Sequence, residues 1–261
     1  MSVVTLLLTT IRVNMASMVE LKKATASCRN FRGLAPEARR QQRRDRLIEA
    51  GIEAFGTRGF YSVTVREICA EAHLTERYFY ESFRSLEDLF TAVFGCVNIE
   101  LRQATLDALA TPTGDPVAVA EAALRVFFKY VRDDPRRGRV LLIESANIGY
   151  TINQLTNEIT RDYMELVRGF INTLFPSVEP RGLNPDLLSA GLIGANVRIA
   201  TTWVQEGFQT SLENVLFTTL AIYRAMITQY GRAGSGMPRP VVEKAEPPAT
   251  STSTRRRTRN P

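Results

Sequence analysis

Apolar residues recur along most of the chain at the spacing of one helical face. Leu47, Ala50, Gly51, Ala54 and Phe55 occupy positions i, i+3, i+4, i+7 and i+8, which is the pattern of an amphipathic α-helix. No stretch alternates Val, Ile and Thr with polar residues at period two between turn residues, as half-buried strands do. The sequence therefore predicts an all-α protein of about nine helices.

Capping residues indicate where the helices after the first begin. Thr64 followed by Glu67 has the pattern of a capping box, which predicts that a short helix begins at residue 65. Thr75 and Ser85 are N-cap residues for the next two helices, and Asp-Pro pairs at 115 and 134 are further start signals. The expected helices cover 65–72, 75–82, 85–110, 115–132, 134–145, 152–175, 185–206 and 212–230.

The two ends of the chain lack this periodicity and carry most of its excess positive charge. Residues 231–261 combine glycines and prolines with a Ser/Thr run and three consecutive arginines, which predicts a disordered basic tail. Residues 1–35 are expected to be a disordered extension. The net charge of +6 divides into +7 over 1–46, −6 over 47–230 and +5 over 231–261. This distribution suits a protein that approaches a polyanion with its ends, and equally suits solubilising tails.

Several kinds of function are disfavoured by the residues that the chain lacks. Its three cysteines, Cys28, Cys69 and Cys96, are odd in number and widely spaced, which suits a reducing cytoplasm. His73 is the only histidine, so one chain cannot assemble a His-based metal site or a Ser-His-Asp triad. No apolar run approaches the ~18 residues of a membrane span. We expect a cytoplasmic protein that is not an enzyme and needs no metal, cofactor or membrane.

Residues 64–83 have the spacing of a helix-turn-helix, with two short helices joined by a three-residue turn. Such a unit places its second helix in the major groove of DNA. An arginine such as Arg77 can pair with guanine or phosphate, and tyrosine hydroxyls can reach phosphate oxygens. Spacing alone leaves DNA binding open, because helical hairpins with arginines also occur in proteins that never bind DNA. The small core of the unit is expected to be Ile68, Ala72, Leu74, Phe79 and Phe83.

The sequence from about residue 40 to 95 resembles the DNA-binding domain of the tetracycline-repressor (TetR) family of bacterial transcriptional regulators. The pieces A-F-G-T-R-G-F, T-V-R-E-I-C-A-E-A, L-T-E-R-Y-F-Y-E-S-F and S-L-E-D-L follow in the order and spacing of that family. The resemblance implies a DNA-binding domain over 36–95, with its helix-turn-helix at 64–83. It also implies a C-terminal effector-binding and dimerisation domain over 96–230.

The resemblance assigns DNA contacts residue by residue. It makes Thr64 and Tyr80 phosphate contacts and places residues 75–78 at the front of the recognition helix. This chain has His73 where glycine is usual, Leu86 where lysine is common and Arg77 where a small residue is common. A basic arm and first turn (Arg39, Arg40, Arg43, Arg44 and Arg46) precede the helix-turn-helix, and Arg84 could replace the charge lost at residue 86. The expected DNA-binding residues are Arg43, Arg44, Thr64, Thr75, Glu76, Arg77, Tyr78, Tyr80 and Arg84.

Aromatic residues are frequent in the C-terminal helices. Such a set is more often core than binding site, but the resemblance favours an apolar pocket that holds an effector. Asn196 and Arg198 could orient that effector, and a place in a dimer interface is an equal alternative for them. The expected ligand-binding residues are Phe127, Tyr150, Tyr163, Phe170, Asn196 and Trp203.

Small residues on the helix over 185–206 allow another helix to approach closely. Gly191 and Gly194, with Leu216, Leu220 and Tyr223 on the last helix, are expected to form a four-helix dimer interface. The alternative is that these residues pack inside a monomer. A dimer would present two recognition helices ~34 Å apart, which predicts a palindromic operator.

The sequence thus predicts a homodimeric, ligand-responsive regulator, most simply a repressor, of double-stranded DNA. Its effector is expected to be small and apolar or amphipathic. One alternative is an effector-independent activator or architectural DNA-binding protein. An α-helical carrier or enzyme is disfavoured, because no phosphate loop, metal-ligand spacing or nucleophile–base pair is evident.

Overall fold

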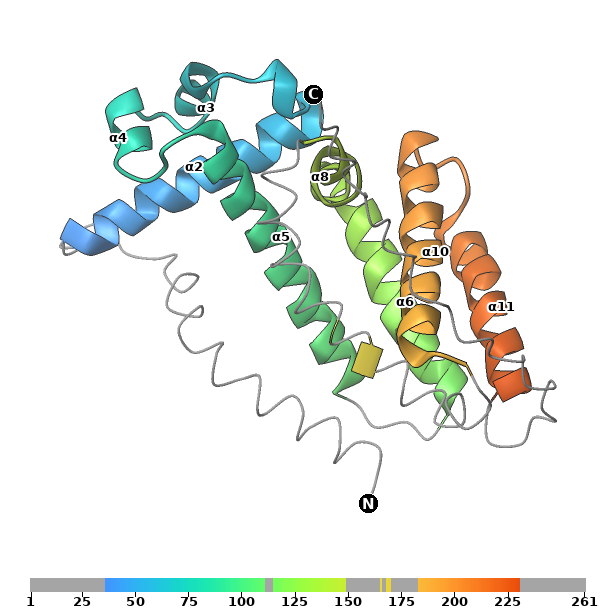
Figure 1. The fold of residues 1–261 in the computed structure, drawn as a ribbon. Coiled ribbons are helices and arrows are strands. Elements are labelled where there is room, and N and C mark those ends of the chain that lie inside the picture. Colours follow the sequence, from blue (N-terminus) through green and yellow to red (C-terminus); the bar gives the residue numbers. More distant parts are fainter. Residues whose placement is uncertain (1–35, 111–114, 149–164, 166–167, 170–182, 231–261) are drawn as a thin grey trace, which may run out of the picture.

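The computed structural model describes residues 36–110, 115–148, 165, 168–169 and 183–230. Within these ranges the regular elements are all helices and no strand occurs (Figure 1), which confirms the predicted all-α fold. The segments expected to be disordered, 1–35 and 231–261, lie outside the described residues. So does the helix expected over 152–175, apart from residues 165 and 168–169.

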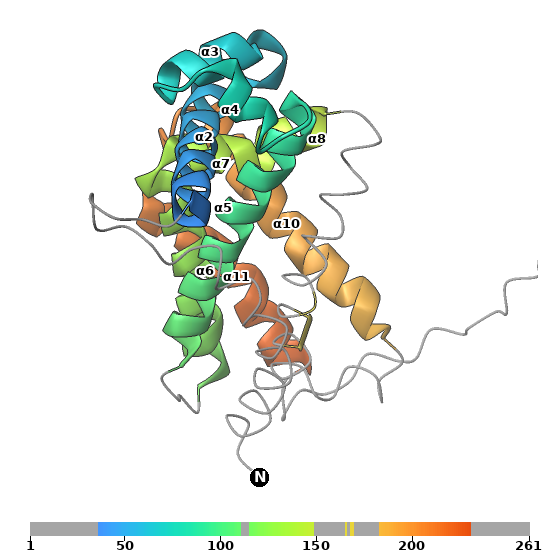
Figure 2. The same ribbon diagram turned by 90° about the vertical axis from the view of Figure 1, so that its left-hand side faces the viewer.

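The helices form a small N-terminal group and a C-terminal group, joined by the long helix α5. In both views α3 and α4 lie at one end of the molecule and α5 runs away from them (Figures 1 and 2). α6 packs against α5, α10 and α11. The bounds are α2 Pro36–Arg58, η1 Phe60–Ser62, α3 Val65–Glu71, α4 Glu76–Tyr80, α5 Leu86–Leu109, α6 Pro116–Asp133, α7 Pro135–Arg139, η2 Val140–Glu144, α8 Ser145–Asn147, α10 Pro185–Gln205 and α11 Leu212–Tyr230.

Most helices begin where the capping pattern predicts, with two differences. The basic segment expected to be an arm is helical from Pro36 onward, so its arginines project from α2. Proline at the first helical position, Glu37 in the first turn and the straight-chain side chains that follow all favour this helix. The helix expected over 134–145 is instead α7, the π-helical turn η2 and the short α8.

Two apolar clusters form the core of the described residues. The first joins α2, the helix-turn-helix and the first half of α5, and contains the fully buried Phe55, Phe79 and Phe90. The second joins α6, α10, α11 and the second half of α5. Tyr130 and Leu141 are partly buried and pack against both clusters. The N-terminal and C-terminal helices are therefore connected by continuous apolar packing.

Helix α2 packs very closely on α7. A Cβ atom added at Gly56 would lie 2.5 Å from Cβ and 2.6 Å from Cα of Arg136, distances that real Cβ atoms do not show. Glycine is therefore needed at this position for the two helices to approach. This contact sets the distance between the DNA-binding helices and the C-terminal helices.

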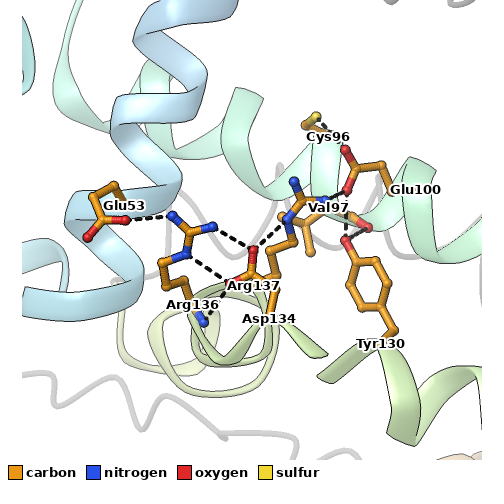
Figure 3. A network of polar contacts seen from close by, with 8 residues as sticks. All are labelled: Glu53, Cys96, Val97, Glu100, Tyr130, Asp134, Arg136 and Arg137. Atoms are coloured by element: carbon orange, nitrogen blue, oxygen red, sulfur yellow. Dashed lines mark hydrogen bonds and ion pairs between the residues drawn. The ribbon is translucent and has the colours of Figure 1, made fainter. Parts of the chain in front are cut away.

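A polar network surrounds the contact between α2 and α7 (Figure 3). Arg136 on α7 donates to Glu53 on α2 at 2.6 Å, and its other nitrogens donate to Asp134 at 2.8 and 2.9 Å. Asp134 also accepts from Arg137 at 3.1 Å. Because Asp134 accepts from the backbone N–H of Arg136 as well, this carboxylate is both the N-cap of α7 and the centre of the network.

The network continues from α7 to α5 and α6. Arg137 forms an ion pair with Glu100 on α5, and Tyr130 on α6 donates to Glu100 at 3.0 Å. Burial raises the pKa of Tyr130, so the phenol stays protonated and remains a donor. Cys96 also faces Glu100, at 3.8 Å, and burial raises its pKa to about 11, which keeps this thiol protonated as expected of a packing residue.

A buried carboxylate makes a second connection between the two groups of helices. Glu144, in the π-helical turn, accepts from the backbone N–H of Phe60 at 2.9 Å and from Arg139 at 2.9 Å. Arg139 in turn donates to the carbonyl oxygen of Thr57 at 2.8 Å. Both oxygens of the buried carboxylate therefore have partners, and the end of α2 is tied to η2.

We predict that Asp134→Asn lowers the free energy of unfolding at neutral pH by about 1 kcal/mol, as expected for loss of charged hydrogen bonds. Burial raises the pKa of Asp134, but the hydrogen bonds and charge of Arg136 and Arg137 outweigh it, so the net pKa lies below its ordinary 3.8. The carboxylate thus stabilises the fold fully above pH 3.8, and this contribution is lost as the pH falls below that value.

Urea unfolding at one protein concentration, from about pH 7 to about pH 3, measures this effect. Asparagine keeps one oxygen as the N-cap acceptor, so the variant removes the charge and the second acceptor oxygen, which accepts from Arg136 and Arg137. Glu49→Gln, an exposed carboxylate of α2, is the control and should leave stability nearly unchanged. A difference between Asp134→Asn and the wild type that does not shrink in acid would contradict the assignment.

Candidate nucleic-acid interface

The first helix of the helix-turn-helix begins with the predicted capping box. The backbone N–H of Glu67 donates to Oγ1 of Thr64 at 3.3 Å, and the Glu67 carboxylate accepts from the Thr64 N–H at 2.8 Å and its hydroxyl at 2.7 Å. These hydrogen bonds from Thr64 lower the pKa of Glu67. The Thr64 hydroxyl, expected at a phosphate, therefore serves first to start α3.

The turn between α3 and α4 is held by backbone hydrogen bonds around a left-handed residue. His73 has φ 53°, the conformation that glycine adopts without strain, as its position in the predicted turn implied. The N–H of Leu74 donates to the carbonyl oxygen of Cys69 at 2.9 Å, and that of His73 to Ala70 at 3.1 Å. The turn directs α4 away from α3 at a fixed angle.

The small core expected beneath the two helices is confirmed. Ile68 and Phe79 are fully buried, Ala72 and Phe83 are buried, and Leu74 is half-buried. Because Phe79 faces inward, the opposite side of α4 faces solvent. There, Glu76 is exposed, Tyr78 is half-buried, and the exposed fractions of the Arg77 side chain and of Tyr80 are 85% and 58%. Thr75, just before α4, makes no side-chain capping bond.

Arginines of α2 support the carboxyl end of α4. Arg40 donates to the carbonyl oxygen of Glu81 at 2.9 Å, and Arg44 donates to that of Ser82 at 2.9 Å. The guanidinium of Arg44 also lies over the ring of Phe83, 4.3 Å from its centroid. Carbonyl groups at a helix end lack partners within the helix, and cations near them are favourable. The five-residue α4 is thus stabilised by contacts from α2.

Arg43 contacts the side chains of the recognition helix. Its guanidinium lies 4.5 Å from the centroid of the Tyr78 ring and forms an ion pair with Glu81 at 3.4 Å. Glu81 also pairs with Arg77 at 3.4 Å. Arg43 and Arg44, expected at DNA, therefore contact α4 and the residues that follow it in the isolated chain. Glu81 was not among the predicted site residues, because its partners on α2 lie about forty residues away in the sequence.

The remaining basic candidate, Arg84, precedes α5. Its side chain is mostly exposed and pairs with Asp88 at 2.7 Å, and the hydrogen bond from Arg84 lowers the pKa of Asp88. Ser85 is the N-cap of α5, accepting from the N–H of Asp88 at 3.3 Å. Two exposed residues near this surface were not expected: Arg66 on α3 and Tyr61, whose hydroxyl donates to the carbonyl oxygen of Asn147.

The candidate ligand residues that the structure describes lie in the second apolar cluster. Phe127 and Trp203 are buried, and the indole N–H of Trp203 donates to the carbonyl oxygen of Thr210 at 2.7 Å. Asn196 donates to the hydroxyl of Tyr223 at 2.8 Å, while its own buried Oδ1 has no partner among the described residues. Tyr150, Tyr163 and Phe170 lie outside them. No cluster of three His, Cys, Asp or Glu in the described ranges could hold a metal ion.

The candidate dimer residues divide into two groups. Leu216, Leu220 and Tyr223 are buried in the core of the chain itself, because they face α6 and α10; this differs from their expected place between two chains. Gly191 and Gly194 are open, with nothing within 4 Å of an added Cβ atom. The large apolar side chains exposed on α10 and α11 are Leu187, Val197, Phe217 and Ile222.

Helix α10 is unusually apolar for an exposed helix. Over Asp186–Gln205 its mean hydropathy is 1.2, and only 22% of this segment is buried in the chain. The expectation that no segment approaches a membrane span in length and apolarity was wrong here: among the described helices, α10 is long and apolar enough to cross a membrane, a property that core helices of soluble proteins share. Much of its apolar surface is left uncovered by the other described helices.

Comparison with known proteins bears on both halves of the chain. Residues 47–93 match the family described as bacterial regulatory proteins, tetR family. Similar folds occur in the fatty acid degradation regulator FadR from Bacillus halodurans (TM-score 0.62, 17% identity, 74% of this chain and 96% of that one) and in FadR from Bacillus subtilis in complex with stearoyl-CoA (0.62, 17%, 69% and 96%). A putative fatty acid metabolism regulator from Clostridium perfringens is also similar (0.57, 18%, 68% and 96%).

The match covers the second half of α2, all of α3 and α4 and the start of α5, and so includes the capping box, the turn and the outward-facing recognition helix. The structural similarity extends the likeness to the C-terminal helices. These observations agree with the resemblance that the sequence motifs indicated. Residues 47–93 of this chain thus match the tetR family of bacterial regulatory proteins, and the described helices share the fold of solved transcriptional regulators.

Proposed function

We propose that this protein is a homodimeric repressor that binds a palindromic operator in the cytoplasm and releases it when an amphipathic effector binds. The observation that carries the proposal is the helix-turn-helix of residues 64–83. Arginines of α2 contact the carboxyl end of its recognition helix α4, and the opposite side of α4 is exposed to solvent. Its action requires binding and not turnover of a substrate. The operator is sought among random duplexes and in the DNA upstream of the protein's own gene.

At the DNA, the exposed residues of α4 divide by chemistry. Tyr80 and Thr64 carry hydroxyls that suit phosphate oxygens, which position a protein without reading sequence. Arg77 and Glu76 suit guanine and cytosine edges in the major groove, and Thr75 and Tyr78 flank them. Arg43, Arg44 and Arg84 add positive charge close to the phosphates, although each already has a partner within the chain.

Replacing Tyr80 by Phe should weaken binding to operator and random duplex by the same factor, about fivefold for one hydrogen bond. Replacing Arg77 by Ala should weaken operator binding more than random binding, because a bidentate contact to guanine contributes about 1–3 kcal/mol of discrimination. Fluorescence anisotropy at about 150 mM salt measures both. Arg132→Ala, a remote exposed arginine of α6, controls for loss of one charge. Equal losses on both duplexes for the two variants would refute these roles.

The proposed dimer uses the uncovered apolar surface of α10 and α11. Phe217 and Leu187 are 65% and 72% exposed, and Gly191 and Gly194 would let the helices of two chains approach closely. Large apolar side chains exposed on neighbouring helices favour an interaction surface. Two chains related by a two-fold axis would then form a four-helix interface.

Phe217→Glu should dissociate the dimer, because each two-fold interface would bury two added carboxylates. Analytical ultracentrifugation at micromolar concentration would show the monomer mass, and operator affinity should fall because only one recognition helix is then bound. Tyr61→Glu, at a comparably exposed aromatic residue of η1, is the control for the mass measurement and should leave the dimer mass unchanged. Wild-type protein that is monomeric at these concentrations would overturn the proposed assembly.

The effector site is proposed within the second apolar cluster, near Phe127, Trp203 and the unpartnered oxygen of Asn196. A buried amide oxygen without a donor is costly unless a ligand supplies one. The similarly folded FadR of Bacillus subtilis is in complex with stearoyl-CoA. We therefore propose a long-chain acyl thioester, apolar at one end and charged at the other, as the class of effector.

Stearoyl-CoA should weaken operator binding by about 5- to 150-fold, and operator should weaken stearoyl-CoA binding by the same factor, because coupling between two ligands is reciprocal. Calorimetry measures the affinity for stearoyl-CoA with and without operator, and the affinity for operator with and without stearoyl-CoA. Coenzyme A and stearate separately are the controls, and each should have a smaller effect. Stearoyl-CoA that binds without changing operator affinity would exclude it as the inducer.

A further inference from the structure

The carboxylate of Glu81 lies between two arginines from different helices. Its Oε1 pairs with Nε of Arg77 at 3.4 Å, and its Oε2 pairs with Nη2 of Arg43 at 3.4 Å. The three side chains differ in exposure: Arg43 is mostly buried, Glu81 is about one-third exposed, and Arg77 is 85% exposed. The chain of charges therefore runs from the interior of the domain to the surface of the recognition helix.

The inner end of this chain is well fixed. Arg43 lies over the ring of Tyr78, and Arg40 donates to the backbone carbonyl oxygen of Glu81 itself at 2.9 Å. Glu81 is thus held by α2 through both its backbone and its side chain. An isolated i,i+4 pair on a helix surface contributes little and leaves both side chains mobile. Here the carboxylate is anchored, so it can restrain Arg77.

The contact with Arg77 uses the edge of the guanidinium that is least needed for base recognition. Guanine offers O6 and N7 in the major groove, and an arginine reads both with two parallel N–H groups. Since Glu81 approaches Nε, the Nη1 and Nη2 groups at the far end of Arg77 stay free to donate as such a pair. The Arg77 side chain is then restrained by Glu81 before DNA binds, which reduces the entropy lost on binding.

We propose that Glu81 is a positioning residue for sequence recognition: through the chain Arg43–Glu81–Arg77 it orients Arg77 to read a guanine in each half-site. This inference rests on the proposed function, sequence-specific DNA binding by α4. It makes Glu81 different from an ordinary surface carboxylate, which would only repel phosphates and lower the affinity for all DNA.

Removing the charge of Glu81 should therefore have opposite effects on two kinds of DNA. With less repulsion, binding to random duplex should be unchanged or tighter. Recognition of the guanine should weaken, because Arg77 must then be ordered at the moment of binding. A residue with a merely electrostatic or structural role would change the affinity for both duplexes in the same direction.

The test uses the full-length chain and Glu81→Gln, which keeps the backbone carbonyl oxygen that Arg40 contacts. Wild-type protein first selects its operator from a random duplex library. Affinities are then measured for the operator, for operators with each G·C pair changed to A·T, and for random duplex. For wild type, changing one G·C pair per half-site to A·T should lower the affinity roughly tenfold or more. This drop in affinity should be absent in Arg77→Ala.

Glu81→Gln should reduce this guanine discrimination by roughly three- to tenfold without weakening random binding. In the Arg77→Ala background the same substitution should cause no further loss of discrimination, because the residue acts through Arg77. Glu71→Gln, an exposed carboxylate of α3, is the control for loss of one negative charge and should keep full discrimination.

Each other outcome overturns the inference or the proposed function. Unchanged guanine discrimination in Glu81→Gln, or equal loss on all duplexes, would overturn the positioning role. Wild-type protein that selects no sequence would overturn sequence-specific binding itself. If circular dichroism shows that Glu81→Gln is unfolded, Arg43→Gln replaces it: this variant releases the carboxylate from α2 and should also lower discrimination, and full discrimination there would overturn the proposal.

Discussion

Helix α2 makes contacts on which the rest of the structure depends, because it touches both the recognition helix and the C-terminal helices. Near its start, Arg40 and Arg44 satisfy carbonyl oxygens at the end of α4. Near its end, Gly56 allows the backbone of α7 to approach closely. A five-residue helix has too few internal hydrogen bonds to persist alone. The orientation of α4, and hence any contact it makes, is set by α2.

Features governed by neighbouring residues could be predicted from the sequence. Thr64 and Glu67 are three positions apart, so their capping box is a local property and was predicted correctly. The left-handed conformation of His73 was implied by the resemblance, because glycine is usual at this position of the turn. The inward-facing Phe79 and Phe83 follow from helical periodicity. These local patterns were enough to predict the helix-turn-helix and its exposed face.

Features governed by distant partners could not be predicted. Arg43 and Arg44 looked like a basic arm, because nothing in the local sequence shows that Glu81 and Ser82 lie beside them. Helical periodicity marks Leu216 and Leu220 as buried, but it does not distinguish burial within one chain from burial between two. The π-helical turn at η2 depends on the buried Glu144 and its partner at Phe60, which are 84 residues apart.

Several arginines in and beside the helix-turn-helix form ion pairs within the chain. Arg58, Arg77 and Arg84 each pair with a carboxylate, so the surface that faces outward is a mosaic of both signs. DNA affinity of such a surface is limited, since each paired arginine must exchange a carboxylate for a phosphate. The same arrangement favours selectivity, because incorrect DNA makes too few contacts to compensate for breaking these ion pairs.

Tyr130 and Leu141, which pack against both apolar clusters, have a consequence for folding. Clusters that share side chains cannot lose their packing separately, since opening one exposes part of the other. The DNA-binding helices should therefore not open as a separate unit while the C-terminal helices stay folded. In hydrogen exchange, the slowest amides of α2 and of α6 should then report the same opening free energy, that of global cooperative unfolding.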